Sequence, residues 1–197
     1  MSEWRPLSFP VLMMTLACTT GLLTGCGGDD KVADLATPST EPASSPVVPP
    51  YTTTLTLDEE QKKAAGEAVV AVVRYLQVTN DVYARGGAGR EAFADVAGGK
   101  LLETITAEAV DMQKTGKRME GRIKPSAEEV VSVSMKERAK VTISACVSND
   151  DFSFRNKDGS ESGQRKFKES TMKFEALRSA GAWKIVGQDV AKYSCKG

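Results

Sequence analysis

The side chains that could do covalent chemistry in this chain are its four cysteines. The sequence of 197 residues contains no histidine, which removes the usual general base at neutral pH, the commonest neutral metal ligand and every Ser-His or Cys-His dyad. A cysteine without such a partner can still react through its thiolate or form a disulfide. The four are Cys18, Cys26, Cys146 and Cys195, and none of them belongs to a C-x-x-C pair.

Two of these cysteines lie in or just behind an apolar N-terminal run. Val11 to Leu23 carries no charge over about 13 residues, which is too short for the roughly 20 residues of a membrane-spanning helix and typical of a signal-peptide core. The segment before it is weakly basic, because Glu3 offsets Arg5. We therefore expect residues 1–25 to be a signal peptide, and Cys18 to be lost with it.

The end of this run, Leu23-Thr24-Gly25-Cys26, resembles the lipobox of bacterial lipoprotein precursors at all four positions. The resemblance implies that Cys26 receives a diacylglyceryl group through its thiolate and becomes the first residue of the mature protein. Two or more acyl chains, such as palmitate, hold a protein stably on a membrane. The expected location is extracytoplasmic, at the outer leaflet of the cell membrane. The alternative is an ordinary secretory leader with a coincidental cysteine.

Composition then separates a tether from a domain. Residues 26–56 contain five of the eight prolines among serines, threonines and alanines, so we expect a disordered tether after the lipidated cysteine. The α+β domain is expected over residues 57–197. The 26 basic and 26 acidic residues of the whole chain cancel, which gives no support for a nucleic-acid partner.

Helical periodicity comes first in the domain. Thr56 and Glu59 have the spacing of a capping box, and an apolar stripe predicts one long helix that ends at Gly86-Gly87. A short helical turn is expected around residues 92–96 and a second helix over residues 100–117.

Beyond these helices the apolar residues alternate, which predicts half-buried strands that pair antiparallel. The expected strands are residues 131–135, 141–147, 172–176 and 183–193. Helices followed by an antiparallel sheet give an α+β fold in which the helices cover one face of a curved sheet.

This order of elements, ending in the AWKIV strand of Ala182 to Val186, resembles the nuclear transport factor 2-like fold, a cone-shaped scaffold. Secreted actinobacterial lipoproteins are similar in further details. These are a cysteine in an A-C-V strand, here Ala145-Cys146-Val147, a D-G turn, here Asp158-Gly159, and a closing cysteine near the C-terminus. The resemblance covers residues 57–197. It implies a scaffold that hosts both enzymes and non-catalytic proteins.

With Cys18 removed and Cys26 acylated, Cys146 and Cys195 have only each other as an intramolecular partner. An exported domain would oxidise them. We expect a structural disulfide, worth about 4 kcal/mol in the chain-entropy model. A redox-active pair is the alternative.

Several other patterns lack the spacing that their chemistry needs. Gly98-Gly99-Lys100 resembles the end of a phosphate loop but is followed by Leu101 and is interpreted as a loop-to-helix junction. We interpret one acidic group as a solvated loop: Asp150, Asp151, Asp158 and Glu161. We interpret one basic group as an exposed strand edge: Arg165, Lys166 and Lys168. We expect three aromatic residues to fill the core: Tyr75, Tyr83 and Trp183.

No catalytic, cofactor-binding or metal-binding residue is predicted. Asp81, two residues from the stripe position Tyr83, is the nearest catalytic candidate and is expected to point outward. We expect a membrane-anchored, non-catalytic binding or accessory module of the cell envelope, with another envelope protein as its partner. The alternative is a protein that binds a small molecule in a pocket, or an enzyme of the isomerase or dehydratase type on the same scaffold.

Overall fold

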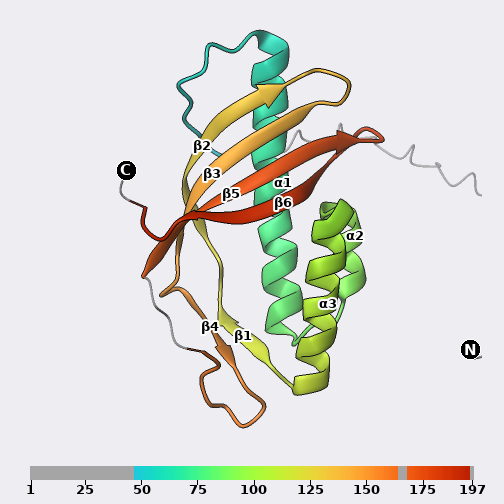
Figure 1. The fold of residues 1–197 in the computed structure, drawn as a ribbon, viewed down its shortest axis with the longest axis vertical. Coiled ribbons are helices and arrows are strands. Elements are labelled where there is room, and N and C mark those ends of the chain that lie inside the picture. Colours follow the sequence, from blue (N-terminus) through green and yellow to red (C-terminus); the bar gives the residue numbers. More distant parts are fainter. Residues whose placement is uncertain (1–46, 164–167, 196–197) are drawn as a thin grey trace, which may run out of the picture. The chain divides into compact units, whose positions relative to one another are not determined.

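The computed structural model describes residues 47–163 and 168–195, and Figure 1 shows their arrangement. The predicted signal peptide and the lipobox with Cys26 lie outside these residues, together with Arg165 and Lys166. No helix in the described part of the chain is long and apolar enough to cross a membrane.

The first helix, α1, spans Glu59–Ala84 and starts with a capping box, but not with the predicted one. The box is formed by Asp58 and Gln61 in place of Thr56 and Glu59. The Gln61 N–H donates to Asp58 Oδ1 at 2.8 Å, and the Asp58 N–H donates to Gln61 Oε1 at 3.1 Å. Aspartate outranks threonine as an N-cap residue, which accounts for the shift.

Two further helices follow the 3-10 turn η1, Arg90–Ala92. The short α2 is Phe93–Val96 and α3 is Gly99–Thr115, so both predicted helical segments are confirmed within two residues at their boundaries. The loop before η1 holds α3 close to the end of α1. Gly87 has φ +87°, and a Cβ there would lie 1.9 Å from the carbonyl oxygen of Ala109 on α3, so only glycine fits.

The sheet has four antiparallel strands in the order β2-β3-β5-β6. All four predicted strands are present, although each extends beyond the predicted residues at one end or both. Their bounds are β2 Pro125–Ser134, β3 Lys140–Ser148, β5 Glu169–Ser179 and β6 Ala182–Lys192. The alternating residues Val141, Ile143 and Ala145 of β3 are buried, so this face of the sheet carries the core.

Two short strands form a separate ribbon that the sequence did not predict. β1, Arg118–Gly121, pairs antiparallel with β4, Phe152–Arg155, so that Met119 lies opposite Phe154. Four residues are too few to show a clear alternation, and β1 contains only one apolar side chain. The ribbon extends past the sheet beside the end of α3 (Figure 1).

The ordered domain begins earlier than predicted, because residues 47–56, which we assigned to the tether, contain a segment bound to β2. The Thr52 N–H donates to the Glu128 carbonyl at 2.9 Å, and the Val130 N–H donates to the Thr52 carbonyl at 2.8 Å. We call residues 47–56 the strap. Composition predicted disorder here, but the open edge of β2 supplies backbone partners that composition does not reveal.

One apolar core joins these elements. The first half of α1 contributes small residues, and the sheet contributes larger ones. The fully buried members at this contact are Ala65, Ala68, Val69, Val72, Val130, Val141, Ile143, Ala176 and Ile185. The structure is therefore an α+β fold with helices packed against antiparallel sheets, as predicted.

Candidate functional site

The predicted pair of cysteines forms a disulfide. Cys146 lies in β3 and Cys195 lies just after β6, with their Cα atoms 5.4 Å apart. Cys146 alternates with the buried Ala145 and Val147, so the disulfide lies on the face of the sheet away from the helices. The pairing joins the C-terminal segment to the middle of the sheet.

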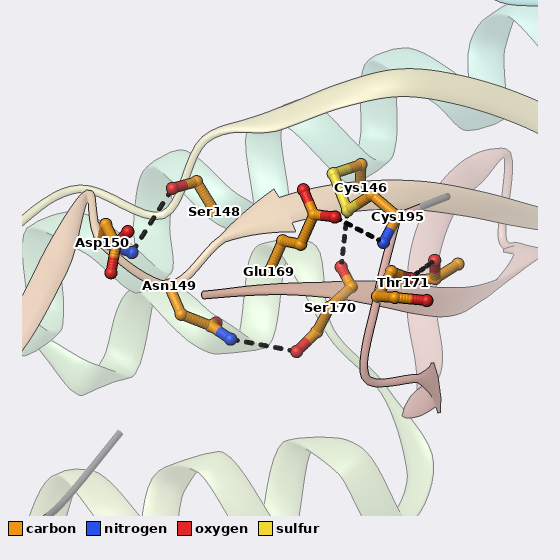
Figure 2. Close-up of a disulfide and its surroundings, with 9 residues drawn as sticks. Cys146, Ser148, Asn149, Asp150, Glu169, Ser170, Thr171 and Cys195 are labelled. Atoms are coloured by element: carbon orange, nitrogen blue, oxygen red, sulfur yellow. Dashed lines mark hydrogen bonds between the residues drawn. A yellow bond between two sulfur atoms is a disulfide. The ribbon is translucent and has the colours of Figure 1, made fainter. Parts of the chain in front are cut away.

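Hydrogen bonds from β5 hold the segment around Cys195 in place (Figure 2). The Cys195 N–H donates to Glu169 Oε1 at 3.1 Å, and Thr171 Oγ1 donates to the Ser194 carbonyl at 2.6 Å. Glu169 and the two sulfur atoms lie within 4.8 Å of one another. Because the sulfurs are bonded to each other, Glu169 alone keeps a free ligand atom, and the arrangement is structural.

A cavity of about 290 Å³ lies between α1, α3, the inner face of the sheet and β4. Its walls include five aromatic rings, those of Tyr75, Tyr83, Phe152, Phe154 and Phe174. Aliphatic side chains fill the spaces between the rings: Leu76, Leu101, Ile105, Ile123, Val147 and Met172. The polar contributors are Thr79, Thr104, Glu108, Asn149 and Gln188. The interior of the domain is therefore hollow and mixed in polarity at this end.

Two tyrosines of α1 place their hydroxyl groups at this cavity. The Tyr75 hydroxyl donates to Gln188 Oε1 at 2.7 Å, and the Tyr83 hydroxyl donates to Glu108 Oε2 at 2.6 Å. Burial raises the pKa of Tyr75 to about 12. Burial, and then the hydrogen bond to Glu108, raise the pKa of Tyr83 as well. Both hydroxyls are therefore protonated at neutral pH and act as hydrogen-bond donors.

Glu108 lies at the rim of the cavity. Its side chain and that of Thr104, one turn earlier on α3, are exposed although both line the cavity, so the cavity opens along this side of the helix. Gln188 of β6 also lines the cavity and is exposed, so the cavity reaches solvent there as well. A second hollow of about 560 Å³ shares Tyr83, Glu108 and Phe154 with the cavity and continues toward Asp111 and Lys117. The hydrogen-bonded pair of Tyr83 and Glu108 thus borders both spaces.

Of the aromatics that we interpreted as core, Tyr75 and Tyr83 are buried in the core and also line the cavity. Trp183 lies elsewhere: its Nε1–H donates to Glu67 Oε2 at 2.8 Å, beside a separate groove on α1. Asp81 points outward as predicted, with Oδ1 at 3.7 Å from Arg122 Nη2 and a largely exposed side chain.

The remaining patterns have structural roles. The Gly98 N–H donates to the Ile185 carbonyl at 2.9 Å where α3 begins, so the glycine pair is the predicted loop-to-helix junction. Asp158 Oδ1 accepts hydrogen bonds from the N–H and hydroxyl of Ser160, and these bonds lower the pKa of Asp158. Lys168 directly precedes β5.

Sequence reasoning missed Glu108 and Gln188. A signal for Glu108 was present, because Leu101, Ile105, Glu108 and Met112 have the spacing of one helical stripe, and a carboxylate interrupts it. Gln188 had no comparable signal. Gln188 pairs with Phe174 of β5. A register shift at Glu175 and Ala176 of β5 interrupts the regular alternation of the two strands next to this pair, so the pattern does not place Gln188 on the inner face.

No family model and no curated protein matches this chain. Among solved structures, the intermembrane space region of the chloroplast protein ARC6 is similar at 16% identity and a TM-score of 0.47, covering 70% of this chain and 99% of its own. Aln2 from a Streptomyces species is similar at 13% identity and a TM-score of 0.40, covering 70% of this chain and 94% of its own. Likenesses this distant carry no functional inference.

Proposed function

We propose that this protein is a lipid-anchored, extracytoplasmic binding module that holds a small molecule inside its domain. The anchor is Cys26, and the scaffold is of the nuclear transport factor 2-like type found in actinobacterial lipoproteins. The disulfide between Cys146 and Cys195 supports an oxidising compartment. The observation that carries the binding role is the cavity beside α1.

The cavity has the features of a ligand site. Its volume of about 290 Å³ is close to the lower end of the roughly 300–1,000 Å³ range of such sites. Its walls are mainly apolar, and its polar groups are few and held in place by hydrogen bonds, as Gln188 is by Tyr75. Such a site gives affinity through buried apolar surface and orientation through a few polar contacts.

A binding role fits these groups better than catalysis does. The tyrosine hydroxyls are protonated donors, and the carboxylate at the rim already accepts one of them. A general base needs a pKa near the working pH and access to a substrate proton. Neither hydroxyl meets the first requirement.

Ligand screening by thermal shift on the full chain tests the cavity. Molecules that bind the folded state raise its melting temperature. We expect Thr104→Trp, which places an indole at the rim from an exposed position, to abolish the shifts produced by the bound molecules. Glu103→Trp, on the same helix but outside the lining, is the matched control and keeps them. Equal shifts in both variants would exclude the cavity as the binding site.

Mass spectrometry of the protein from cells tests the anchor. We expect a mature chain that begins at Cys26 and carries acyl chains, and a Cys26→Ser variant that leaves the membrane fraction. A native chain that starts upstream of Cys26, or that carries an unmodified thiol there, would refute lipidation.

A second candidate is docking of another envelope protein, favoured by the groove on α1. This groove, of about 470 Å³, is lined by the apolar side chains of Val48, Val70, Ala71 and Trp183 and by the charged side chains of Lys63, Glu67, Arg74 and Asp95. Protein interfaces likewise combine apolar and polar surface. A photocrosslinker at Val70 in intact cells should then capture one partner, and a crosslinker at Glu103 should not. Absence of a specific product would remove this candidate.

A further inference from the structure

We infer that the ligand of the cavity is an organic cation with an apolar body, bound with its charge against Glu108 and its body among the aromatic rings. This inference rests on the proposed function and adds the chemical class of the ligand. It follows from the distribution of charge and of aromatic rings around the cavity.

The charges at the cavity have one sign. Among the described residues that line it, Glu108 is the one carboxylate, and none is lysine or arginine. In the neighbouring hollow the charges of Asp111 and Lys117 offset each other. An anionic ligand would therefore meet a carboxylate at the rim with no cation to compensate it, whereas a cationic ligand would find its counter-ion there.

The aromatic rings lie where such a charge would be attracted. Tyr83 donates its hydroxyl to Glu108, and its ring centroid lies 6.2 Å from that of Phe154. The Phe154 centroid in turn lies 6.2 Å from that of Phe152. The carboxylate thus stands at one end of a continuous aromatic wall. Ring faces attract an ammonium group within about 6 Å, and more strongly when water is excluded.

The depth of the cavity orients the ligand. Glu108 and Thr104 are exposed at the rim, whereas Tyr75 and Phe174 are buried at the opposite wall and lie in edge-to-face contact, with centroids 6.4 Å apart. A cationic head would stay near the rim, where its hydration loss is small, and the apolar body would enter the interior. Gln188, held by Tyr75 and itself exposed on β6, offers its amide to a polar atom on that body where the cavity reaches this strand.

Three probes of similar size that differ in charge test the inference. They are benzyltrimethylammonium, its uncharged isostere neopentylbenzene and the anion phenylacetate. Their dissociation constants are measured with the full chain, purified in detergent, by ligand-observed nuclear magnetic resonance. We expect the cation to bind about tenfold more tightly than the isostere, and phenylacetate to bind most weakly.

The matched variants are Glu108→Gln and Glu103→Gln. The glutamine at position 108 keeps an acceptor for Tyr83, so the fold is retained, and an unchanged melting temperature confirms this. We expect Glu108→Gln to weaken binding of the cation about twofold to fivefold and to leave the isostere unchanged. Glu103→Gln, on an exposed position outside the lining, should change neither.

The outcomes separate this inference from the proposed function. Equal affinities for the cation and the isostere, or an unchanged cation affinity in Glu108→Gln, would overturn the cationic class while leaving a small-molecule pocket in place. Failure of all three probes to bind up to the solubility limit of each, with equal thermal shifts in Thr104→Trp and the unmodified chain, would overturn the pocket and the inference together.

Discussion

The two halves of α1 face the same side of the sheet, but the first half packs into the core and the second half borders a cavity. The first half presents Ala65, Ala68, Val69 and Val72, which are fully buried in the core between the helix and the sheet. The second half presents Tyr75, Thr79 and Tyr83, and these line a cavity. Small apolar side chains allow the sheet to approach the helix, whereas tyrosines whose hydroxyls need partners hold it away. The difference shows how one helical stripe can build a closed core and a binding site.

The largest expected effect concerns the wall behind the cavity. Cys146 is next to Val147, which lines the cavity, so the disulfide supports this half of the domain from the outer face. Replacing both cysteines with serine should lower the free energy of unfolding by about 4 kcal/mol. Denaturant unfolding measures this loss. A reductant should lower the melting temperature of the unmodified chain and leave that of the double variant unchanged; equal sensitivity would contradict a stabilising disulfide.

Truncation of matched isoleucines compares the two halves directly. Ile143 lies in the packed region and Ile105 lines the cavity, and both are buried. Ile143→Ala should cost about 3 kcal/mol, because it creates a void in a filled core. Ile105→Ala should cost clearly less, since its side chain already borders empty space. Chemical denaturation of both variants provides the measurement, and equal losses would mean that the cavity is closed in solution.

A smaller effect is expected where the cavity half is joined to the ribbon. Asn80 of α1 is buried, and its side chain accepts from the Ile123 N–H at 2.8 Å and donates to the Ile123 carbonyl at 3.0 Å. Asn80→Ala leaves both backbone groups without this partner and should cost about 2 kcal/mol. Asn80→Asp keeps the acceptor for the Ile123 N–H but turns a carboxylate oxygen toward the Ile123 carbonyl, so it should cost at least as much. Hydrogen exchange at the Ile123 amide would report the local opening; unchanged protection in Asn80→Ala would refute this role.

The last effect appears only at alkaline pH and is smallest at neutral pH, where stability does not change with pH through Tyr75. The folded state binds the Tyr75 proton more tightly than the unfolded chain, since its pKa is raised from 10.0 to about 12. The stabilisation that comes from the raised pKa of Tyr75 is complete below pH 10. As the pH rises toward 12, the free energy of unfolding falls by up to about 1.4 kcal/mol per pH unit. Tyr75→Phe should flatten the slope of unfolding free energy against pH in this window. Tyr51→Phe, in the strap, is the control, and an equal flattening there would contradict the assignment.

Much of the fold could be predicted from the sequence because periodicity reports which face of an element is buried. The stripe of α1 and the alternation of β3 indicated the main layers. The cysteine pair followed from counting. β1 and β4 could not be predicted, because four residues are shorter than the pattern that would reveal them.

The cavity was beyond sequence reasoning for a different reason. Apolar side chains such as Ile105 and Phe174 have the same pattern whether they fill a core or line a space. Only Glu108, a carboxylate within an apolar stripe, carried local information about the site. The strap was hidden by its composition, because its order depends on partners in β2 that composition does not reveal.

The strap also determines how mechanical load would enter the domain. Tension transmitted from the N-terminal side would first reach Val48 and Tyr51, which contact α1. It would then reach Thr52, whose hydrogen bonds to Glu128 and Val130 pass it to the outermost strand of the sheet. Thr53 Oγ1 adds a third link, to the Val130 carbonyl at 2.8 Å. A pull from that direction would load the contacts of the strap with α1 and β2 before it reached the cavity. The strap would therefore detach before the part of the domain that contains the cavity is deformed.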